Sequence, residues 1–245
     1  MRTGKKLSEV CMKKLLPVLV MVLMVLSNSV YAKYNKKESE VKKNPKDIVD
    51  FYAIIPGEYI DSSIGSLSFQ ERLDYLEKGP NKKVVVDVKN AYIYISAIPG
   101  DFSVNQTIVY FVKSDKTKII AVSTTGESGE CGEYSIFNFY EYKNGKFNFV
   151  TDQVIPKLSI DLFAADTDKK SITAKINKAM VYKIELPQKG TTCKVYPVGI
   201  CEVDNSLGLD EYNKYLEIES NFAYSYLELK WNKTKGKFEF GKKFK

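Results

Sequence analysis

The chain has 245 residues, with 37 Lys and Arg against 30 Asp and Glu, and it contains no histidine. Hydrophobic residues make up 44% of it and charged residues 27%, which is typical of a globular protein and not of a disordered or fibrous one. The lack of histidine excludes Ser-His-Asp and Cys-His catalysis, histidine-ligated zinc and histidine-bound haem. No phosphate-binding glycine motif occurs, so no cofactor is expected.

The first 32 residues have the pattern of a secretory signal peptide. Two lysines precede an uninterrupted apolar run at 15–26, and small residues stand at the −3 and −1 positions of an expected cut after Ala32. The run is shorter than the roughly 20 residues that span a bilayer. We therefore expect an exported protein, in the periplasm, on the cell surface or outside, with no transmembrane span after cleavage. An uncleaved anchor is the alternative.

Lysines gather near both ends of the remaining chain. Residues 33–46 carry six Lys against two Glu, and residues 230–245 carry seven Lys against one Glu. Such surpluses can steer a protein towards anionic surfaces, although solvated terminal lysines are the commoner explanation. Arg72 is the one arginine after residue 32. Because bidentate recognition of phosphate and guanine favours arginine, we do not expect a nucleic-acid partner.

Three cysteines follow the expected cut, and an odd number leaves one of them unpaired within the chain. Cys193 and Cys201 flank Pro197 and Gly199, which are typical turn residues, so a short-loop disulfide between them is predicted. Cys131 is then the odd thiol, with a bridge from it to either partner as the alternative. Three cysteines without histidine and without a CxxC pair do not indicate a metal site.

Helices are predicted first along the chain. Residues 33–46 are polar and lysine-rich, which indicates a flexible arm. Asn44 and Pro45 are expected to open a helix whose apolar face runs from Ile48 to Ile55. Ser68 and Glu71 form the capping-box pattern of a second helix.

From residue 83 the apolar period changes to two, which predicts strands. The predicted strands cover residues 83–88, 91–97, 107–113, 118–124, 134–143, 146–151, 158–164, 171–176, 180–186, 191–196, 215–219, 223–231 and 237–240. Asn144-Gly145 is typical of a two-residue type I′ hairpin turn. No helical pattern separates the strands, so the expected fold class is α+β, mainly antiparallel β meanders with two N-terminal helices.

Residues 134–149 resemble residues 224–240, which suggests that each half of the chain ends in the same kind of hairpin. A duplicated module whose copies form a cleft is one interpretation, and chance similarity between amphipathic hairpins is the other. We divide the mature chain into the arm 33–46, a helical and β module at 47–155, and a second β-rich module at 156–245. The two modules are expected to share a core.

Tyrosines are the main lead to function. Tyr92 and Tyr94 share one strand face, and Tyr134, Tyr140 and Tyr142 share another, where exposed rings would suit a protein or glycan partner. Packing against helices or a second sheet is the commoner role of such faces. No catalytic residue is assigned. The sequence therefore favours a non-catalytic exported protein that binds a macromolecule through a β surface. The alternatives are a carboxylate-dependent hydrolase of cell-wall or host glycan, which requires two acids in one cleft, and a structural component of the envelope.

Overall fold

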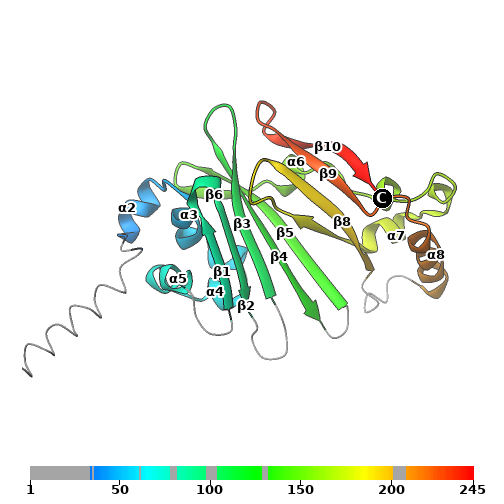
Figure 1. Cartoon of the computed structure of the whole chain (residues 1–245), viewed down its shortest axis with the longest axis horizontal. Helices are drawn as coiled ribbons and strands as arrows, with labels where there is room; N and C mark the ends of the chain where they lie inside the picture. The colour runs from blue at the N-terminus through cyan, green and yellow to red at the C-terminus, as the bar shows by residue number, and fades with distance from the viewer. Residues whose placement is uncertain are drawn as a thin grey trace, which may run out of the picture. The chain divides into compact units, whose positions relative to one another are not determined.

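The structure is a computed structural model that describes residues 34, 36–60, 62–77, 82–97, 104–128, 132–200 and 208–245. Residues Glu38–Lys245 belong to one compact unit (Figure 1). The expected signal peptide, Cys131 and Cys201 lie outside the described residues. The two sheets and few helices of this unit confirm the α+β, mainly antiparallel fold class.

The first sheet is a six-stranded antiparallel meander whose strands follow the order of the chain. Its strands are β1 (Lys82–Asp87), β2 (Tyr92–Ala97), β3 (Val104–Val112), β4 (Lys118–Ser128), β5 (Gly132–Lys143) and β6 (Lys146–Phe149). A 3₁₀ turn, η2 (Val88–Asn90), joins β1 to β2. Asn144 and Gly145 have φ angles of 53° and 75° between β5 and β6, as a type I′ turn requires, and the predicted two-residue hairpin is confirmed.

Short helices precede this sheet: α2 (Glu38–Lys43), α3 (Ile48–Ile54), η1 (Gly57–Tyr59), α4 (Ser62–Gly65) and α5 (Phe69–Tyr75). The predicted capping box of α5 is confirmed, because Ser68 and Glu71 each accept a hydrogen bond from the other's backbone nitrogen. The predicted cap of α3 is wrong by three residues. Asp47, not Asn44, accepts from the nitrogens of Val49 and Asp50, since a carboxylate placed directly before the apolar face reaches the free donors of the first turn.

Helix α2 forms within the segment expected to be a flexible arm. It buries Val41, and the backbone oxygen of Lys42 accepts a hydrogen bond of 3.0 Å from the Tyr142 hydroxyl on β5. Val41 and this hydrogen bond together attach the short helix to the rest of the unit. None of the described helices is long and apolar enough to cross a membrane.

The second sheet has four antiparallel strands in the order β10-β9-β8-β7. They are β7 (Met180–Glu185), β8 (Thr192–Ile200), β9 (Tyr226–Asn232) and β10 (Lys237–Phe244), and the remaining elements are α6 (Thr151–Val154), η3 (Ile160–Leu162), η4 (Lys169–Ser171), α7 (Ala174–Ala179) and α8 (Leu209–Ser220).

Three predicted strands are wrong. Residues 158–164 contain η3, residues 171–176 enter α7, and residues 215–219 lie in α8. Tyr215 and Ile218 are both buried, three residues apart, which places them on one helix face. Short apolar segments of this kind fit both the helical period of 3.6 residues and the strand period of two, and packing decides which structure forms.

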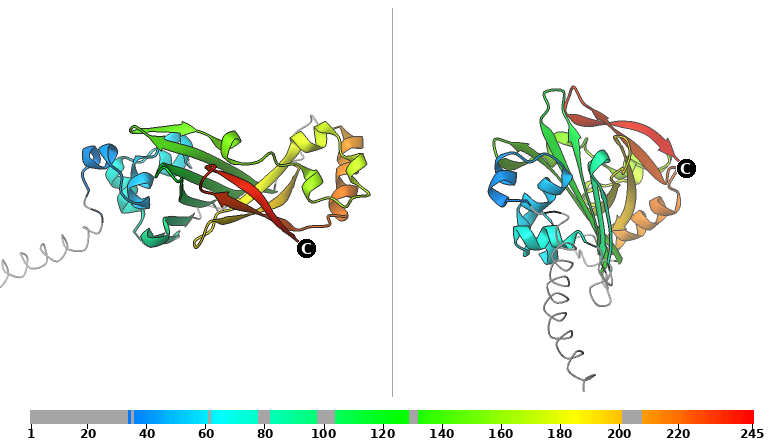
Figure 2. Two further views of the ribbon diagram at one scale, coloured as in Figure 1. Left: turned by 90° about the horizontal axis from the view of Figure 1, so that it is seen from above. Right: turned by 60° about the vertical axis from the view of Figure 1, so that its left-hand side comes forward.

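The two sheets enclose one hydrophobic core that draws on residues from Val109 to Phe238. Alternation along the strands separates the two faces of the first sheet. Phe139 faces the second sheet and contacts Phe238, whereas Tyr140 next to it stacks on Tyr59 from the helical segment. Figure 2 shows the N-terminal helices and the second sheet on opposite sides of the first sheet.

The two similar sequence segments both form hairpins, β5–β6 in the first sheet and β9–β10 in the second. The tips of β3–β4 and β9–β10 are bound to each other: the Ser114 nitrogen donates to the Lys233 oxygen at 3.0 Å, and Trp231 Nε1 donates to the Val112 oxygen at 3.2 Å. The two sheets are therefore joined at this end.

Candidate functional site

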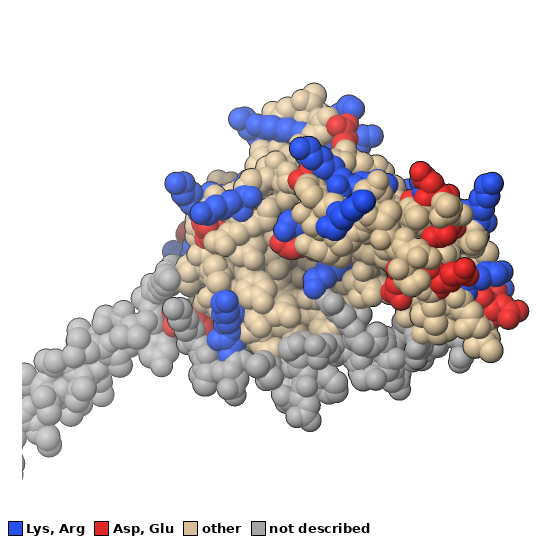
Figure 3. Space-filling model, turned by 45° about the vertical axis from the view of Figure 1, so that its right-hand side comes forward, with Lys and Arg blue, Asp and Glu red and all other residues tan. Residues whose placement is uncertain are grey.

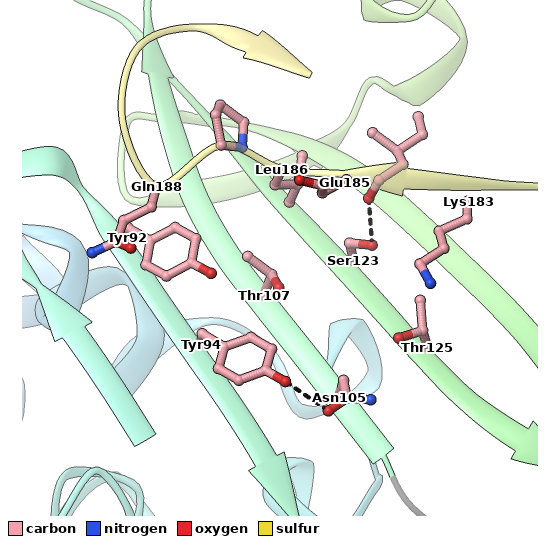
Figure 4. A pocket seen from close by; sticks show the side chains of 12 residues that line it. Tyr92, Tyr94, Asn105, Thr107, Ser123, Thr125, Lys183, Glu185, Leu186 and Gln188 are labelled. Atoms are coloured by element: carbon pink, nitrogen blue, oxygen red, sulfur yellow. Dashed lines mark hydrogen bonds between the residues drawn. The ribbon is translucent and has the colours of Figure 1, made fainter. Parts of the chain in front are cut away.

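A cleft of about 340 Å³ opens between the first sheet and strand β7 with the turn that follows it (Figure 4). It is lined by Tyr92 and Tyr94 of β2, Asn105 and Thr107 of β3, Ser123 and Thr125 of β4, and residues Lys183, Ile184, Glu185, Leu186, Pro187 and Gln188 of β7 and its turn. Six of these residues come from three neighbouring strands, so the cleft floor is a flat β surface.

Strand register brings these side chains together. Tyr94 pairs with Thr107, and Thr107 with Ser123, so all three lie on the face of the first sheet that looks away from the helices. Strand β7 crosses this face and is fixed there, because buried Ser123 donates from Oγ to the Ile184 oxygen at 2.9 Å. The second sheet thus covers one part of the face and leaves the part around Tyr94 open.

The floor of the cleft offers both flat rings and polar groups. The Tyr94 hydroxyl donates to Asn105 Oδ1 at 2.8 Å, and the Asn105 amide nitrogen has no hydrogen bond with any described residue. Burial raises the pKa of the Tyr92 phenol, although a hydrogen bond with Thr107 opposes this effect. Tyr92 therefore stays protonated at neutral pH and can act as a donor.

The turn between β7 and β8 closes one side of the cleft. Gln188 Nε2 donates to Asp87 Oδ2 at 3.1 Å, and Asp87 also accepts from the backbone and side-chain nitrogens of Asn90. The bonds from Asn90 and then Gln188 lower the pKa of the Asp87 carboxyl. The carboxylate thus attaches this turn to the first sheet.

Glu185, the last residue of β7 before this turn, is already engaged. It accepts a hydrogen bond of 2.9 Å from the Tyr196 hydroxyl and lies 3.6 Å from Lys194 Nζ. Burial, and next the Glu185 carboxylate, raise the pKa of Tyr196. Glu185 can accept hydrogen bonds from a ligand.

The five predicted tyrosines do not form one site. Tyr92 and Tyr94 line this cleft, whereas the other three lie on the opposite face of the same sheet. Tyr140 is buried with its ring 4.2 Å from Tyr59, and burial raises its pKa to about 12. Tyr142 packs edge-on against Phe51. Tyr140 and Tyr142 therefore have the packing role that is the commoner one for such faces.

Tyr134 lines a second, smaller cleft of about 230 Å³ on the helical face, together with Glu58, Tyr59, Ile60, Ser62, Val122, Thr124, Ile136 and Asn138. The two similar hairpins form neither of these two clefts between them, because strands β2–β4 and β7 line the larger one and the smaller one lies on the helical face. A cleft built from duplicated copies stays a prediction.

Sequence reasoning did not single out the polar residues of the floor. Residues 105–107 are Asn-Gln-Thr and residues 123–125 are Ser-Thr-Thr, so both segments are polar throughout and no alternation with apolar residues marks one face. Their proximity depends on which strands pair and on where β7 crosses, which a single sequence does not specify.

Cys193 is a buried free thiol, and burial raises its pKa. Strand β8 runs from Thr192 to Ile200 through Pro197 and Gly199, so the predicted turn is wrong. A nine-residue strand spans about 26 Å at 3.3 Å per residue, whereas the Cα atoms of a disulfide lie within about 7 Å. The argument for the short-loop disulfide therefore no longer holds, and Cys201 itself lies outside the described residues.

Carboxylates of the described residues do not converge in either cleft. Among these residues, Glu185 is the one acid that lines the larger cleft, and Glu58 the one that lines the smaller. Among the described residues no group of three acids and cysteines could hold a metal ion. The described carboxyl groups with a shifted pKa, which are Glu71, Asp87, Asp115, Asp166 and Glu239, are all shifted downward. A glycosidase acid needs the opposite shift.

No family model matches the chain, and no curated protein matches it. A domain of an uncharacterized protein from Porphyromonas gingivalis W83 is similar in structure, with a TM-score of 0.49 and 14% sequence identity. The match covers 79% of this chain and 97% of that one. A likeness this distant indicates neither an activity nor a partner.

Proposed function

We propose that this is an exported, non-catalytic protein that binds a glycan on the β surface of the larger cleft. The observation that carries the proposal is the composition of that cleft, in which two tyrosine rings lie beside two amides, three Ser and Thr hydroxyls, one carboxylate and one lysine. Export follows from the signal-peptide pattern of residues 1–32.

A sugar ring has an apolar face and a rim of hydroxyl groups. Tyrosine rings can pack on such a face, while Asn105, Thr107 and Glu185 can donate to or accept from the hydroxyl groups. The cleft lacks the large apolar pocket that anchors most protein partners. A glycan thus fits its chemistry better than a folded protein does.

The test is a glycan-array screen with residues Glu38–Lys245, followed by calorimetric titration of each glycan that binds. Tyr94→Phe removes the hydroxyl that bonds Asn105 and keeps the ring, and Asn105→Ala removes the amide. We expect each change to weaken binding about tenfold, the equivalent of one lost hydrogen bond of roughly 1.4 kcal/mol.

Tyr134→Phe is the matched control, because it removes a tyrosine hydroxyl from the opposite face and should leave the affinity unchanged. Equal losses in Tyr94→Phe and Tyr134→Phe would contradict this cleft as the site. A protein partner that is lost in the two cleft variants would replace the glycan. Release of shorter glycan products would favour the hydrolase instead.

A further inference from the structure

Lysines from three hairpins gather at the end of the unit where the tips of β3–β4 and β9–β10 are joined. Lys116 lies in the β3–β4 turn, Lys143 and Lys146 flank the β5–β6 turn, and Lys233 and Lys237 flank the β9–β10 turn. All five are exposed, and none of them forms an ion pair with a described residue. We call these five residues the lysine tip.

The three hairpins are held in place relative to one another. The bond from the Ser114 nitrogen to the Lys233 oxygen joins the first to the third, and the 3.0 Å ion pair between Lys113 and Glu141 joins the first to the second. Gly236 permits the close approach of the Lys113 side chain, whose Cε would lie 2.8 Å from a Cβ at that position. The five ammonium groups therefore project from a structured scaffold.

The carboxylates near the tip are already engaged. Glu141 pairs with Lys113, and Glu239 pairs with Lys235 at 2.6 Å. Asp115 accepts from the Thr117 nitrogen at 2.9 Å, and the hydrogen bonds with Thr117 are the main reason why its pKa is lowered. The surplus charge at this end is therefore positive.

Figure 3 shows lysine side chains around this upper end, while acidic side chains gather on the right-hand side of the view. Helix α8 carries four acidic residues, Asp210, Glu211, Glu217 and Glu219, against Lys214. This separation of charge orients the protein in an electric field, with the lysine tip towards an anionic surface.

We propose that the lysine tip binds the surface of a lipid bilayer that contains anionic lipids. The ammonium groups belong to protruding turns and not to a groove, which suits a flat array of phosphates. Residues 113–117, 143–146 and 233–237 contain neither an arginine nor an aromatic ring. Duplex readout favours arginine and single strands favour aromatic stacking, so nucleic acid fits this tip less well. These three segments also contain no large apolar residue, so we expect the tip to contact the lipid head groups without inserting into the bilayer.

This inference is independent of the proposed glycan cleft. The cleft residues of β3 and β4 lie at 105–107 and 123–125, whereas the tip follows residue 112 of β3. A protein bound to a membrane through the tip would keep the floor of its cleft, at the other end of β3, away from that surface.

The experiment is co-sedimentation of residues Glu38–Lys245 with vesicles at low and high salt. This unit excludes the apolar run at 15–26, which would bind lipid by itself. One set of vesicles contains phosphatidylglycerol in phosphatidylcholine and the other phosphatidylcholine alone. The test variant is Lys116→Gln/Lys143→Gln/Lys233→Gln, one lysine from each hairpin. The control is Lys170→Gln/Lys175→Gln/Lys214→Gln, which removes equal charge from exposed sites on η4, α7 and α8.

We expect binding to the anionic vesicles only, and weaker binding at high salt because counter-ions screen exposed charges. Each lysine near an anionic surface contributes roughly a fivefold gain in affinity, so the tip variant should bind about a hundredfold more weakly. The control variant should lose much less. Circular dichroism verifies that both variants fold.

Three results would overturn the proposal. They are equal binding to both kinds of vesicle, equal losses in the tip and control variants, and absence of vesicle binding by a protein that does bind heparin or single-stranded DNA. The last result would indicate a site for a soluble polyanion.

Discussion

The two faces of the first sheet have similar sequence patterns and different roles. On the helical face, Tyr140 is buried beneath the segment that contains Tyr59, and its ring belongs to the packing. On the other face, Tyr94 is half-exposed at the edge of the second sheet and lines a cleft. Alternation decides which tyrosines share a face, and the elements that cover the face decide what they do.

The largest expected effect contrasts these two tyrosines. Tyr140→Ala removes a fully packed ring and should lower the free energy of unfolding by about 4 kcal/mol. Tyr94→Ala should cost less than about 1 kcal/mol, because its ring lies at a cleft surface. Chemical denaturation measures both values. Similar losses in the two variants would contradict the distinction between the faces.

Arg72 tests how the helical face is held together. Its buried guanidinium donates to the backbone oxygens of Ile55, Gly65 and Leu67. Arg72→Met would leave these carbonyls without a donor and should lower the free energy of unfolding by about 3 kcal/mol. Arg72→Lys should restore part of the loss, since one ammonium cannot reach all three oxygens. Full stability of the Met variant in urea would show that solvent replaces the guanidinium.

Ser123 tests the junction between the cleft face and the second sheet. Ser123→Ala removes the donor to the Ile184 oxygen and should cost about 1 kcal/mol of unfolding free energy. Thr125→Ala, two residues along the same face and half-exposed, is the control and should cost less than about 0.5 kcal/mol. If the thermal midpoints of the two variants coincide, this hydrogen bond does not stabilise the junction.

The smallest expected effect concerns pH and the turn that closes the cleft. The Asp87 carboxyl has its pKa lowered below the ordinary 3.8 by its hydrogen bonds. A group of this kind stabilises the fold above its unfolded-state pKa, and the stabilisation is lost as the pH falls through the folded-state pKa.

Wild type should therefore melt slightly above Asp87→Asn at neutral pH, and the difference should shrink as the pH falls below 3.8. Thermal melts at neutral pH and at about pH 3 measure it. Asp74→Asn, an exposed acid on α5, should show no such convergence. A constant difference at both pH values for Asp87→Asn would mean that its charge does not matter.

Local signals in the sequence predicted local structure well. The capping box at Ser68 and the Asn144-Gly145 turn are decided by residues within a few positions, and both were predicted correctly. The helical form of residues 215–219 was not predicted, because their apolar pattern also fits a strand. Only the structure shows that Tyr215 and Ile218 are buried on one face of a helix.

The site was predictable only in part. Tyr92 and Tyr94 were identified from their shared strand face, but Asn105 and Ser123 join them through pairing of β2, β3 and β4. The contribution of β7 depends on a crossing between residues 61 positions apart, Ser123 and Ile184. Contacts at such sequence distances follow from packing of the whole sheet and leave no mark in the spacing of residues.

The bonds between the hairpin tips have a mechanical consequence. Ser114 and Trp231 fasten the β3–β4 and β9–β10 tips to each other, and the Trp231 nitrogen also donates to the Thr191 oxygen, where the β7–β8 turn ends. The β7–β8 turn therefore lies at the same end of the second sheet as the fastened tips, and Gln188 holds it to Asp87 of the first sheet. This wall of the cleft is thus fixed in place before a ligand arrives. Amide hydrogen exchange should accordingly be slow at Trp231, and a ligand in the cleft should change it little.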